Sequence, residues 1–192
     1  AGRLDEALAD GREVVAGWTR EYGPTHLSTI EARSNLGVVL FAMGRVAEAQ
    51  AEFQAAVKGL ETSLGKGNPE ILPALSNLGV TLMTLGRLDE AAAAIEAVMA
   101  QSEAAFGPQG GYHGVALINA GELRIAQRRF DEALEIERKA ISILEARGMD
   151  PSALCEPLTQ VALAELGAGR VASALDPVER ALQIGKDKSI PP

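Results

Sequence analysis

The 192-residue chain is poor in cysteine and in aromatic side chains. Its single cysteine, Cys155, excludes an intramolecular disulfide framework and fits a reducing compartment. Aromatic residues make up 4% of the chain while hydrophobic residues make up 47%, so the interior has to be built mainly from Ala, Leu, Val and Ile. Side chains of this kind suit closely packed helices.

Basic charge and long apolar runs are also scarce. The chain has 18 Lys and Arg against 26 Asp and Glu, a formal net charge of −8, and no basic stripe, so we expect no binding to nucleic acid or to a membrane surface. No apolar run approaches the roughly 18 residues of a spanning helix, and no signal peptide is recognised. We expect a cytoplasmic protein, and the start in the middle of a repeat indicates a piece of a longer one.

A hexapeptide recurs along the sequence at a nearly fixed spacing. Residues 86–91 read Gly-Arg-Leu-Asp-Glu-Ala, and residues 2–7 are identical. Looser copies begin at positions 44, 128 and 169, so the successive spacings are 42, 42, 42 and then 41. A fixed period in this range indicates a solenoid, in which each unit packs on its neighbours.

Apolar residues at helical spacing predict two helices in each period, which we call the first and second type. Gly23-Pro24 ends the opening helix, because glycine is the usual left-handed cap and proline cannot continue a helix. The prediction is an all-α, right-handed α-solenoid of antiparallel helix pairs with about nine helices over residues 1–185. Its parts are a second-type helix at 2–22, repeats at about 26–64, 69–106, 111–147 and 151–185, and a C-terminal tail at 186–192.

Prolines mark several helix starts. Asn68-Pro69 and Asp150-Pro151 each place a capping side chain before a proline at the first helical position. Pro177 falls inside the last predicted helix, so we expect a kink or a break near Asp176.

Small residues recur at matched places on both helix types, where they let two helices approach closely. On the first type they are Gly37, Gly79, Gly121 and Ala162, and on the second type they are Ala7, Ala49, Ala91, Ala133 and Ala174. Ala7, Gly11 and Val14 are expected to face a helix that would precede the chain. Trp18 aligns with Leu60 and Leu144 and is expected in the core.

The series Leu36-Gly37, Ala49, Phe53 and Ala56 resembles the signature of tetratricopeptide repeats. The 42-residue period, Asn35-Leu36-Gly37 and the Gly-Pro-x-His loop at 23–26 resemble the kinesin light chain variety, which also occurs in bacterial multidomain signalling proteins. The resemblance implies a concave groove, lined by the first-type helices, that receives a peptide or protein segment.

An amide recurs in one column of the first-type helices, at Asn35, Asn77 and Asn119, with Gln160 in the last repeat. An amide both donates and accepts hydrogen bonds, so a ladder of amides can hold the backbone of an extended peptide. The alternative is that these amides bond neighbouring helices or water. Further residues predicted to line the groove are Glu31, Ser34, Val38, Ser76, Val80, Thr84, Glu122 and Glu156.

Two arginines, Arg33 and Arg124, stand where leucines align in other repeats. An unpaired charge in a helix seam is costly, so each must reach water or find a partner. The alternative is that they ring the groove and pair with an acidic ligand. The many Glu and Asp residues are expected on solvated helix exteriors.

Residues with catalytic potential are few. His26 and His113 are expected in inter-helix loops in a capping role, and nothing near them gives metal-ligand spacing. The glycine-rich stretch 107–114 follows a helix, unlike a phosphate-binding loop fed by a strand, and is expected to be a lengthened or loosened loop. We expect no cofactor, no metal and no enzymatic activity.

The sequence therefore predicts a protein–protein interaction module, a regulatory or scaffolding part of a larger protein. The alternative is a structural spacer or self-association element that uses the solenoid ends. Weak homo-association through uncovered apolar surface at the first helix is also expected.

Overall fold

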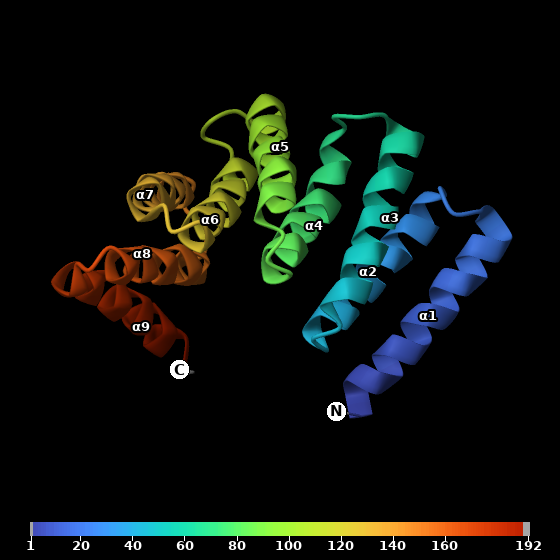
Figure 1. Ribbon diagram of the computed structural model, residues 1–192, viewed down its shortest axis with the longest axis horizontal. Helices are drawn as coiled ribbons and strands as arrows, with labels where there is room; N and C mark the ends of the chain where they lie inside the picture. The colour runs from blue at the N-terminus through green and yellow to red at the C-terminus, as the bar shows by residue number, and fades with distance from the viewer. Residues whose placement is uncertain (1, 190–192) are drawn as a thin grey trace. The chain divides into compact units, whose positions relative to one another are not determined.

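The computed structural model describes residues 2–189, with side chains from 3 to 186, and these residues form α helices and short 3-10 helices without a strand (Figure 1). The nine α helices of this described part agree with the prediction. They are α1 (Gly2–Tyr22), α2 (Leu27–Ala42), α3 (Val46–Leu64), α4 (Leu72–Thr84), α5 (Leu88–Phe106), α6 (Gly111–Ala126), α7 (Phe130–Ala146), α8 (Cys155–Gly167) and α9 (Leu175–Ser189). The 3-10 helices are η1 (Pro69–Ile71), η2 (Pro151–Leu154) and η3 (Val171–Ala174).

The helices form two compact units, unit 1 (Ala1–Ala94) and unit 2 (Ile95–Pro192), whose boundary falls inside α5. In unit 1, α2 packs against α1 and α3, and α3 packs against α4. In unit 2, α6 packs against α7, α7 against α8, and α8 against both α6 and α9. Each unit thus repeats the predicted alternation of first-type helices (α2, α4, α6, α8) with second-type helices.

Short links lead into each first-type helix, at 23–26, 65–68, 107–110 and 147–150. Three of them carry caps, because the side chains of His26, Asn68 and Asp150 accept hydrogen bonds from the backbone N–H two residues later. The glycine-rich link at 107–110 is no longer than the others. Gly111 and Gly114 belong to α6, so of the two alternatives, a lengthened or a loosened loop, the structure contradicts the lengthened one.

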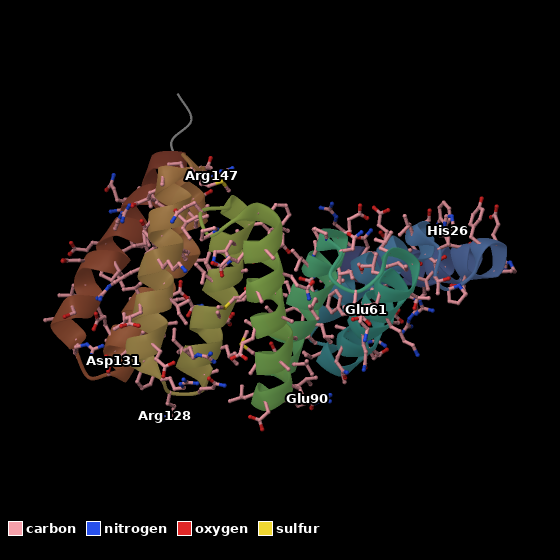
Figure 2. All side chains as sticks on the ribbon, turned by 90° about the horizontal axis from the view of Figure 1, so that it is seen from above. His26, Glu61, Glu90, Arg128, Asp131 and Arg147 are labelled. Carbon is pink, nitrogen blue, oxygen red and sulfur yellow. The ribbon has the colours of Figure 1, made fainter. Side chains whose placement is uncertain are left out.

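Arg128 occupies the position that glycine holds in the other copies of the hexapeptide. Its φ of 61° is close to the 73° of Gly44 and Gly86, so the tight turn keeps the same left-handed backbone with a side chain that disfavours it. Figure 2 labels Arg128 at this turn between α6 and α7, and Arg147 at the opposite end of α7. The turn geometry therefore follows the repeat and not the residue type.

The chain is not one continuous α helix near Pro177, since η3 ends at Ala174 and α9 begins directly at Leu175. The change from 3-10 to α helix comes without an interruption, and Asp176 lies in the first turn of α9 and does not cap it. Pro177 consequently lies in the first turn of α9, where its missing N–H costs no helical hydrogen bond. The tail predicted from residue 186 was wrong, because α9 continues to Ser189. Residues 190–192 lie outside the part that the structure describes.

Glycines of the first-type helices receive side chains of the second-type helices. A Cβ at Gly37 would lie 2.7 Å from a ring carbon of Phe53, and a Cβ at Gly121 would lie 2.0 Å from Oε1 of Glu137. The alanine column beside this contact is closed to solvent, with Ala49 and Ala133 fully buried. Because glycine has no side chain, it leaves room on the first-type helix for a large side chain of the next helix.

Three expectations about individual residues need correction. Trp18 is 38% exposed and tilts against Tyr22, because no further helix of the described chain covers that side of α1. Gly11 faces the following helix, since a Cβ there would lie 3.3 Å from Leu36. His113 lies in the first turn of α6 and is buried, so it has no capping role in a loop.

We predict that Gly37→Ala lowers the free energy of unfolding by about 1–3 kcal/mol, the usual cost of overpacking a core. The new methyl group would displace the buried ring of Phe53. Gly17→Ala in α1 is the matched control, because nothing lies within 4 Å of its Cβ position. The control should gain up to about 1 kcal/mol of helix propensity. Urea unfolding of both variants tests this, and an unchanged Gly37→Ala protein would contradict the contact.

Candidate functional site

Five of the predicted binding residues line two recesses between α2 and α4, a surface that we call the α2–α4 face. The first recess has a volume of about 200 Å³ and is lined by Val38, Phe41, Ala42, Phe53, Asn77, Val80 and Thr81. The second has a volume of about 360 Å³ and is lined by Leu27, Ile30, Glu31, Ser34, Leu60, Glu70, Pro73, Ala74 and Asn77. Asn77 belongs to both linings and therefore lies where the two recesses meet.

The first recess is apolar and depends on the glycine contact described above. Phe53 reaches it from α3 because Gly37 leaves room for the ring, and Val38 beside it is 51% exposed. The backbone of Asn77 is occupied, since its carbonyl accepts a hydrogen bond from Thr81 Oγ1 at 2.6 Å. Its side-chain amide has no hydrogen-bond partner among the described residues, so it is available to a ligand.

Other predicted residues of unit 1 lie outside these recesses. Asn35 is exposed on α2 but lines neither recess. The hydroxyl group of Thr84 donates a hydrogen bond to the carbonyl of Val80 at 3.0 Å, and Ser76 is half-buried on α4. The structure therefore does not bring the whole predicted set together on the α2–α4 face.

Unit 2 carries the remaining predicted residues, and α6 and α8 are in contact there; we call this surface the α6–α8 face. Asn119 and Glu122 lie on α6, and Glu156 and Gln160 lie on α8. Glu122 is half-buried, and its burial together with the nearby carboxylate of Glu156 raises its pKa. The α6–α8 face thus carries Glu122 at the position that Val38 holds on the α2–α4 face, and Glu156 at the position of Pro73.

Glu137 of α7 is a buried carboxyl group that the sequence analysis missed. Its side chain is 0% exposed, and neither oxygen has a hydrogen-bond partner in the described part of the chain. Burial raises its pKa to about 9, with smaller contributions from Glu156 and Glu122, so the group is neutral at pH 7. The repeat could have predicted the burial of Glu137, because this residue occupies the same place in its period as the apolar residues Phe53 and Ile95 do in theirs.

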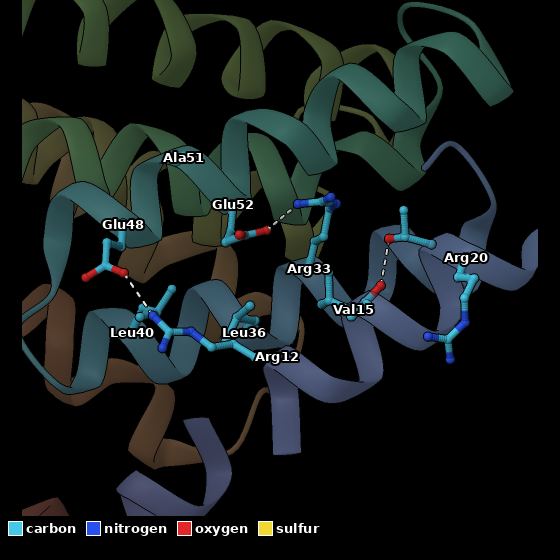
Figure 3. Close-up of a pocket in the computed structure, with 11 residues that line it drawn as sticks. Arg12, Val15, Arg20, Arg33, Leu36, Leu40, Glu48, Ala51 and Glu52 are labelled. Carbon is cyan, nitrogen blue, oxygen red and sulfur yellow. Dashed lines mark hydrogen bonds and ion pairs between the residues drawn. The ribbon is translucent and has the colours of Figure 1, made fainter. Parts of the chain in front are cut away.

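Arg33 has an internal partner and does not reach the α2–α4 face. It lines a recess of about 620 Å³ between α1, α2 and α3, shown in Figure 3. Its guanidinium donates to Glu52 at 2.7 Å, and Arg12 across the recess pairs with Glu48 at 3.1 Å. The pair with Glu52 supplies the partner that the charge of Arg33 was expected to need.

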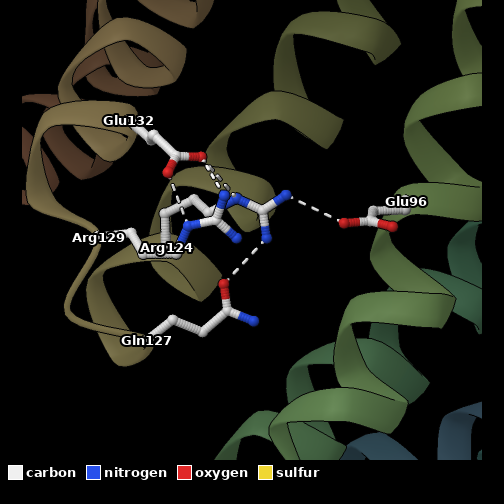
Figure 4. A network of polar contacts seen from close by, with 5 residues as sticks. All are labelled: Glu96, Arg124, Gln127, Arg129 and Glu132. Atoms are coloured by element: carbon white, nitrogen blue, oxygen red, sulfur yellow. Dashed lines mark hydrogen bonds and ion pairs between the residues drawn. The ribbon is translucent and has the colours of Figure 1, made fainter.

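Arg124 is likewise held within the protein. Figure 4 shows its guanidinium between Glu96, Gln127 and Glu132, with the shortest contacts of 3.0 Å to Glu96 and to Gln127. Its side chain is only 14% exposed, so the stem is packed while the charge is shared with two carboxylates. We therefore assign Arg124 to the packing between helices.

Ser102 and His113 form a buried polar pair in unit 2, with 3.1 Å between Oγ and Nδ1. They are 0% and 1% exposed, and burial lowers the pKa of His113. The pair takes the place that Leu60 and Ile71 hold in the repeat before, where both are core residues. A serine–histidine pair closed to solvent offers no nucleophile to a substrate, so we assign it to the core.

Neither a metal-binding cluster nor a membrane-spanning helix is found in the described residues. Within 2–189, no group of three His, Cys, Asp or Glu side chains is placed to hold a metal ion. None of the helices described by the structure is both long and apolar enough to span a bilayer.

A profile of the tetratricopeptide repeat family matches residues 1–62 and 70–146, more than half of the chain. The chain belongs to the tetratricopeptide repeat family. This confirms the resemblance found in the sequence. Among curated proteins, no sequence match was found.

Solved structures similar to this tetratricopeptide repeat chain include kinesin light chain-like proteins. BtubC (BKLC) from P. vanneervenii has a TM-score of 0.79 at 20% identity, over 100% of this chain and 77% of that one. A putative kinesin light chain of Podosopora anserina, with nearly identical TPR-like repeats, has a TM-score of 0.76 at 19% identity, over 97% and 89%. Aspartyl phosphate phosphatase F from Bacillus subtilis has a TM-score of 0.71 at 16% identity, over 85% and 42%. Identities this low show the fold alone, an all-α repeat solenoid. Membership of the tetratricopeptide repeat family supports a general role in protein–protein interaction.

We predict that the free energy of unfolding falls as the pH rises from about 5 to 9. The pKa of Glu137 is raised from 4.5 to about 9, so across this window the folded protein keeps a proton that the unfolded chain has released. The contribution to the slope is at most about 1.4 kcal/mol per pH unit. Glu137→Gln, which is neutral at every pH, should flatten the dependence in urea unfolding. The exposed Glu135→Gln on the same helix should keep it, and equal slopes in both variants would contradict the assignment.

Proposed function

We propose that this tetratricopeptide repeat chain is an interaction module that binds an extended segment of a partner protein on the α2–α4 face. The observation that carries the proposal is the position of Asn77, whose free amide lies between an apolar recess and a mixed polar recess. Such an amide can both donate to and accept from the backbone of a bound segment, whatever the sequence of that segment.

The two recesses supply the selectivity that a backbone contact lacks. In an extended segment, side chains two residues apart point the same way and lie about 7 Å from each other. One such side chain would enter the recess over Phe53 and take up apolar contacts with Val38 and Val80. The next would reach the recess lined by Glu31 and Ser34, which offers polar partners.

A regulatory or scaffolding role in the cytoplasm, within a larger protein, fits a module of this kind. Its action is equilibrium binding without chemistry on the partner. The buried state of the Ser102–His113 pair and the internal pairing of Arg33 and Arg124 support this view.

We predict that Asn77→Ala weakens segment binding about fivefold without unfolding the chain, the loss expected for one hydrogen bond of about 1 kcal/mol. The probes are peptides selected on the immobilised chain from a random display library. Their affinities for the parent and the variant are measured by fluorescence anisotropy.

Asn35→Ala is the matched control, because Asn35 is an exposed asparagine of the neighbouring first-type helix that lines neither recess. It should bind the selected peptides as the parent does. Unchanged affinity in Asn77→Ala, with unchanged thermal melting, would remove the α2–α4 face from the mechanism.

Self-association is a second candidate function, favoured by an apolar stripe on α1. Leu4, Val14, Trp18 and Tyr22 are each 38–48% exposed on this helix. Contact of two copies through the stripe would remove apolar surface from water, worth roughly 25 cal/mol per Å².

We predict that the chain shows a concentration-dependent increase in mass in analytical ultracentrifugation and that Trp18→Gln reduces it. The control is Leu182→Gln, which changes an exposed apolar residue of α9. A monomer at all concentrations, or equal behaviour of the two variants, would speak against self-association through α1.

A further inference from the structure

The two units place different residues at equivalent positions of the same framework. A residue of unit 1 corresponds to the residue two periods later in unit 2, which is 84 positions further along the chain. Because the last period is one residue shorter, the difference is 83 positions for residues of α8. By this register, Glu137 corresponds to Phe53, and Gly121 corresponds to Gly37. The structure supports the correspondence, because Gly121 makes room for Glu137 as Gly37 does for the ring of Phe53.

The surroundings of Glu137 correspond to the apolar recess of unit 1. Val38 becomes Glu122, Asn77 becomes Gln160, and Val80 becomes Leu163. Phe53 lines the recess on the α2–α4 face. The equivalent carboxyl group of Glu137 therefore lies beneath the α6–α8 face, below a rim that carries Glu122 on one helix and Leu163 on the other.

The acidic groups at this place have no positive partner within the described residues. Besides burial, the carboxylate of Glu156 raises the pKa of Glu122, and both of these groups raise the pKa of Glu137. No cation contributes to either shift. Neither oxygen of Glu137 finds a hydrogen bond although the side chain is fully buried. A buried polar group left unpartnered is costly, so this carboxyl group lacks something that a ligand could supply.

Nearby basic side chains are already engaged elsewhere. Arg124 of α6 is held by Glu96 and Glu132, and Arg138 of α7 is held by Glu165 of α8 at 3.1 Å. These two arginines are therefore not paired with Glu122, Glu156 or the buried carboxyl group of Glu137.

We propose that the α6–α8 face binds an arginine or lysine side chain of a partner segment, with its charge between Glu122 and Glu156 and above the carboxyl group of Glu137. The proposal rests on the proposed function and names the partner chemistry that unit 2 selects. A compact metal ion is not the favoured ligand, since no triad of carboxylates in the described chain is placed to hold one. A long side chain suits a site with two carboxylates at the rim and one below.

Binding of the cation would be coupled to the release of a proton. Glu137 holds a proton in the free protein at pH 7, because its pKa is about 9. A guanidinium group favours the ionised carboxylate, so affinity should rise with pH between 6 and 9, by at most about tenfold per pH unit. Arginine is the better probe, because its charge does not change over this range.

The test is a nuclear magnetic resonance titration of the whole chain, with labelled glutamate carboxyl carbons. The probes are N-acetylarginine amide and its neutral isostere, N-acetylcitrulline amide. We expect the arginine probe alone to shift the carbon signals of Glu122, Glu137 and Glu156. Glu122→Gln and Glu137→Gln should each weaken the arginine probe by about fivefold or more, the loss of one partly buried charge pair. Glu137→Gln should also abolish the rise with pH.

Glu135→Gln is the matched control, since this exposed residue of α7 lies outside the acidic group. It should bind the arginine probe as the parent does. If Glu137→Gln does not fold, the double variant Glu122→Gln/Glu156→Gln, which keeps the buried carboxyl group, takes its place. Equal shifts with the citrulline probe, or arginine binding that no acidic variant weakens, would overturn the proposal.

The same variants separate this inference from the proposed function. Suppose that the library peptides bind Asn77→Ala more weakly than the parent, but show no preference for arginine or lysine and bind Glu122→Gln as they bind the parent. This result would support the proposed function and contradict the inference about the α6–α8 face. If the arginine probe binds at Glu122 and Glu137 while the library yields no peptide, the result would support the inference and contradict the proposed function.

Discussion

The packing of Phe53 onto Gly37 is the contact on which unit 1 depends. The ring occupies the place where any other residue at position 37 would carry its Cβ, and it is only 2% exposed. This close approach joins α2 to α3 and at the same time forms part of the recess below Val38. The shape of the α2–α4 face is therefore a consequence of core packing, so a change in the core changes the face.

Helix boundaries and part of the face could be predicted from the sequence, because glycine and proline mark the ends and the period fixes the register. The bounds of α1 are as predicted, and α3 ends at the predicted end of its repeat. The recesses lie between the first-type helices α2 and α4, and Asn77 lines both of them from the side of α4 that faces α2. The same amide on α2, Asn35, has no earlier first-type helix among the described residues to face.

The remaining features depend on which side of each helix is covered, and residue type misleads there. Acidic residues favour solvent, so the sequence predicts a surface carboxylate at Glu137, yet its column places it inside. Trp18 is the reverse case, a core residue by its column that is partly exposed on α1. His113 is expected in a loop because glycines surround it, but α6 begins two residues earlier. Tertiary context decided each case against local propensity.

Arg124, Glu137 and Glu165 are ionisable residues of unit 2 that stand in core columns which are apolar in unit 1, and only Arg124 and Glu165 have partners of opposite charge. Arg124 and Glu165 share the column of Leu40, and each forms ion pairs with residues of neighbouring helices. Glu137 forms none within the described chain, although its two oxygens are closed to solvent. Since an apolar residue there would pack without that cost, the fold alone does not require the carboxyl group. A buried acid that the fold does not need is what the proposed binding of a cationic side chain on the α6–α8 face would explain.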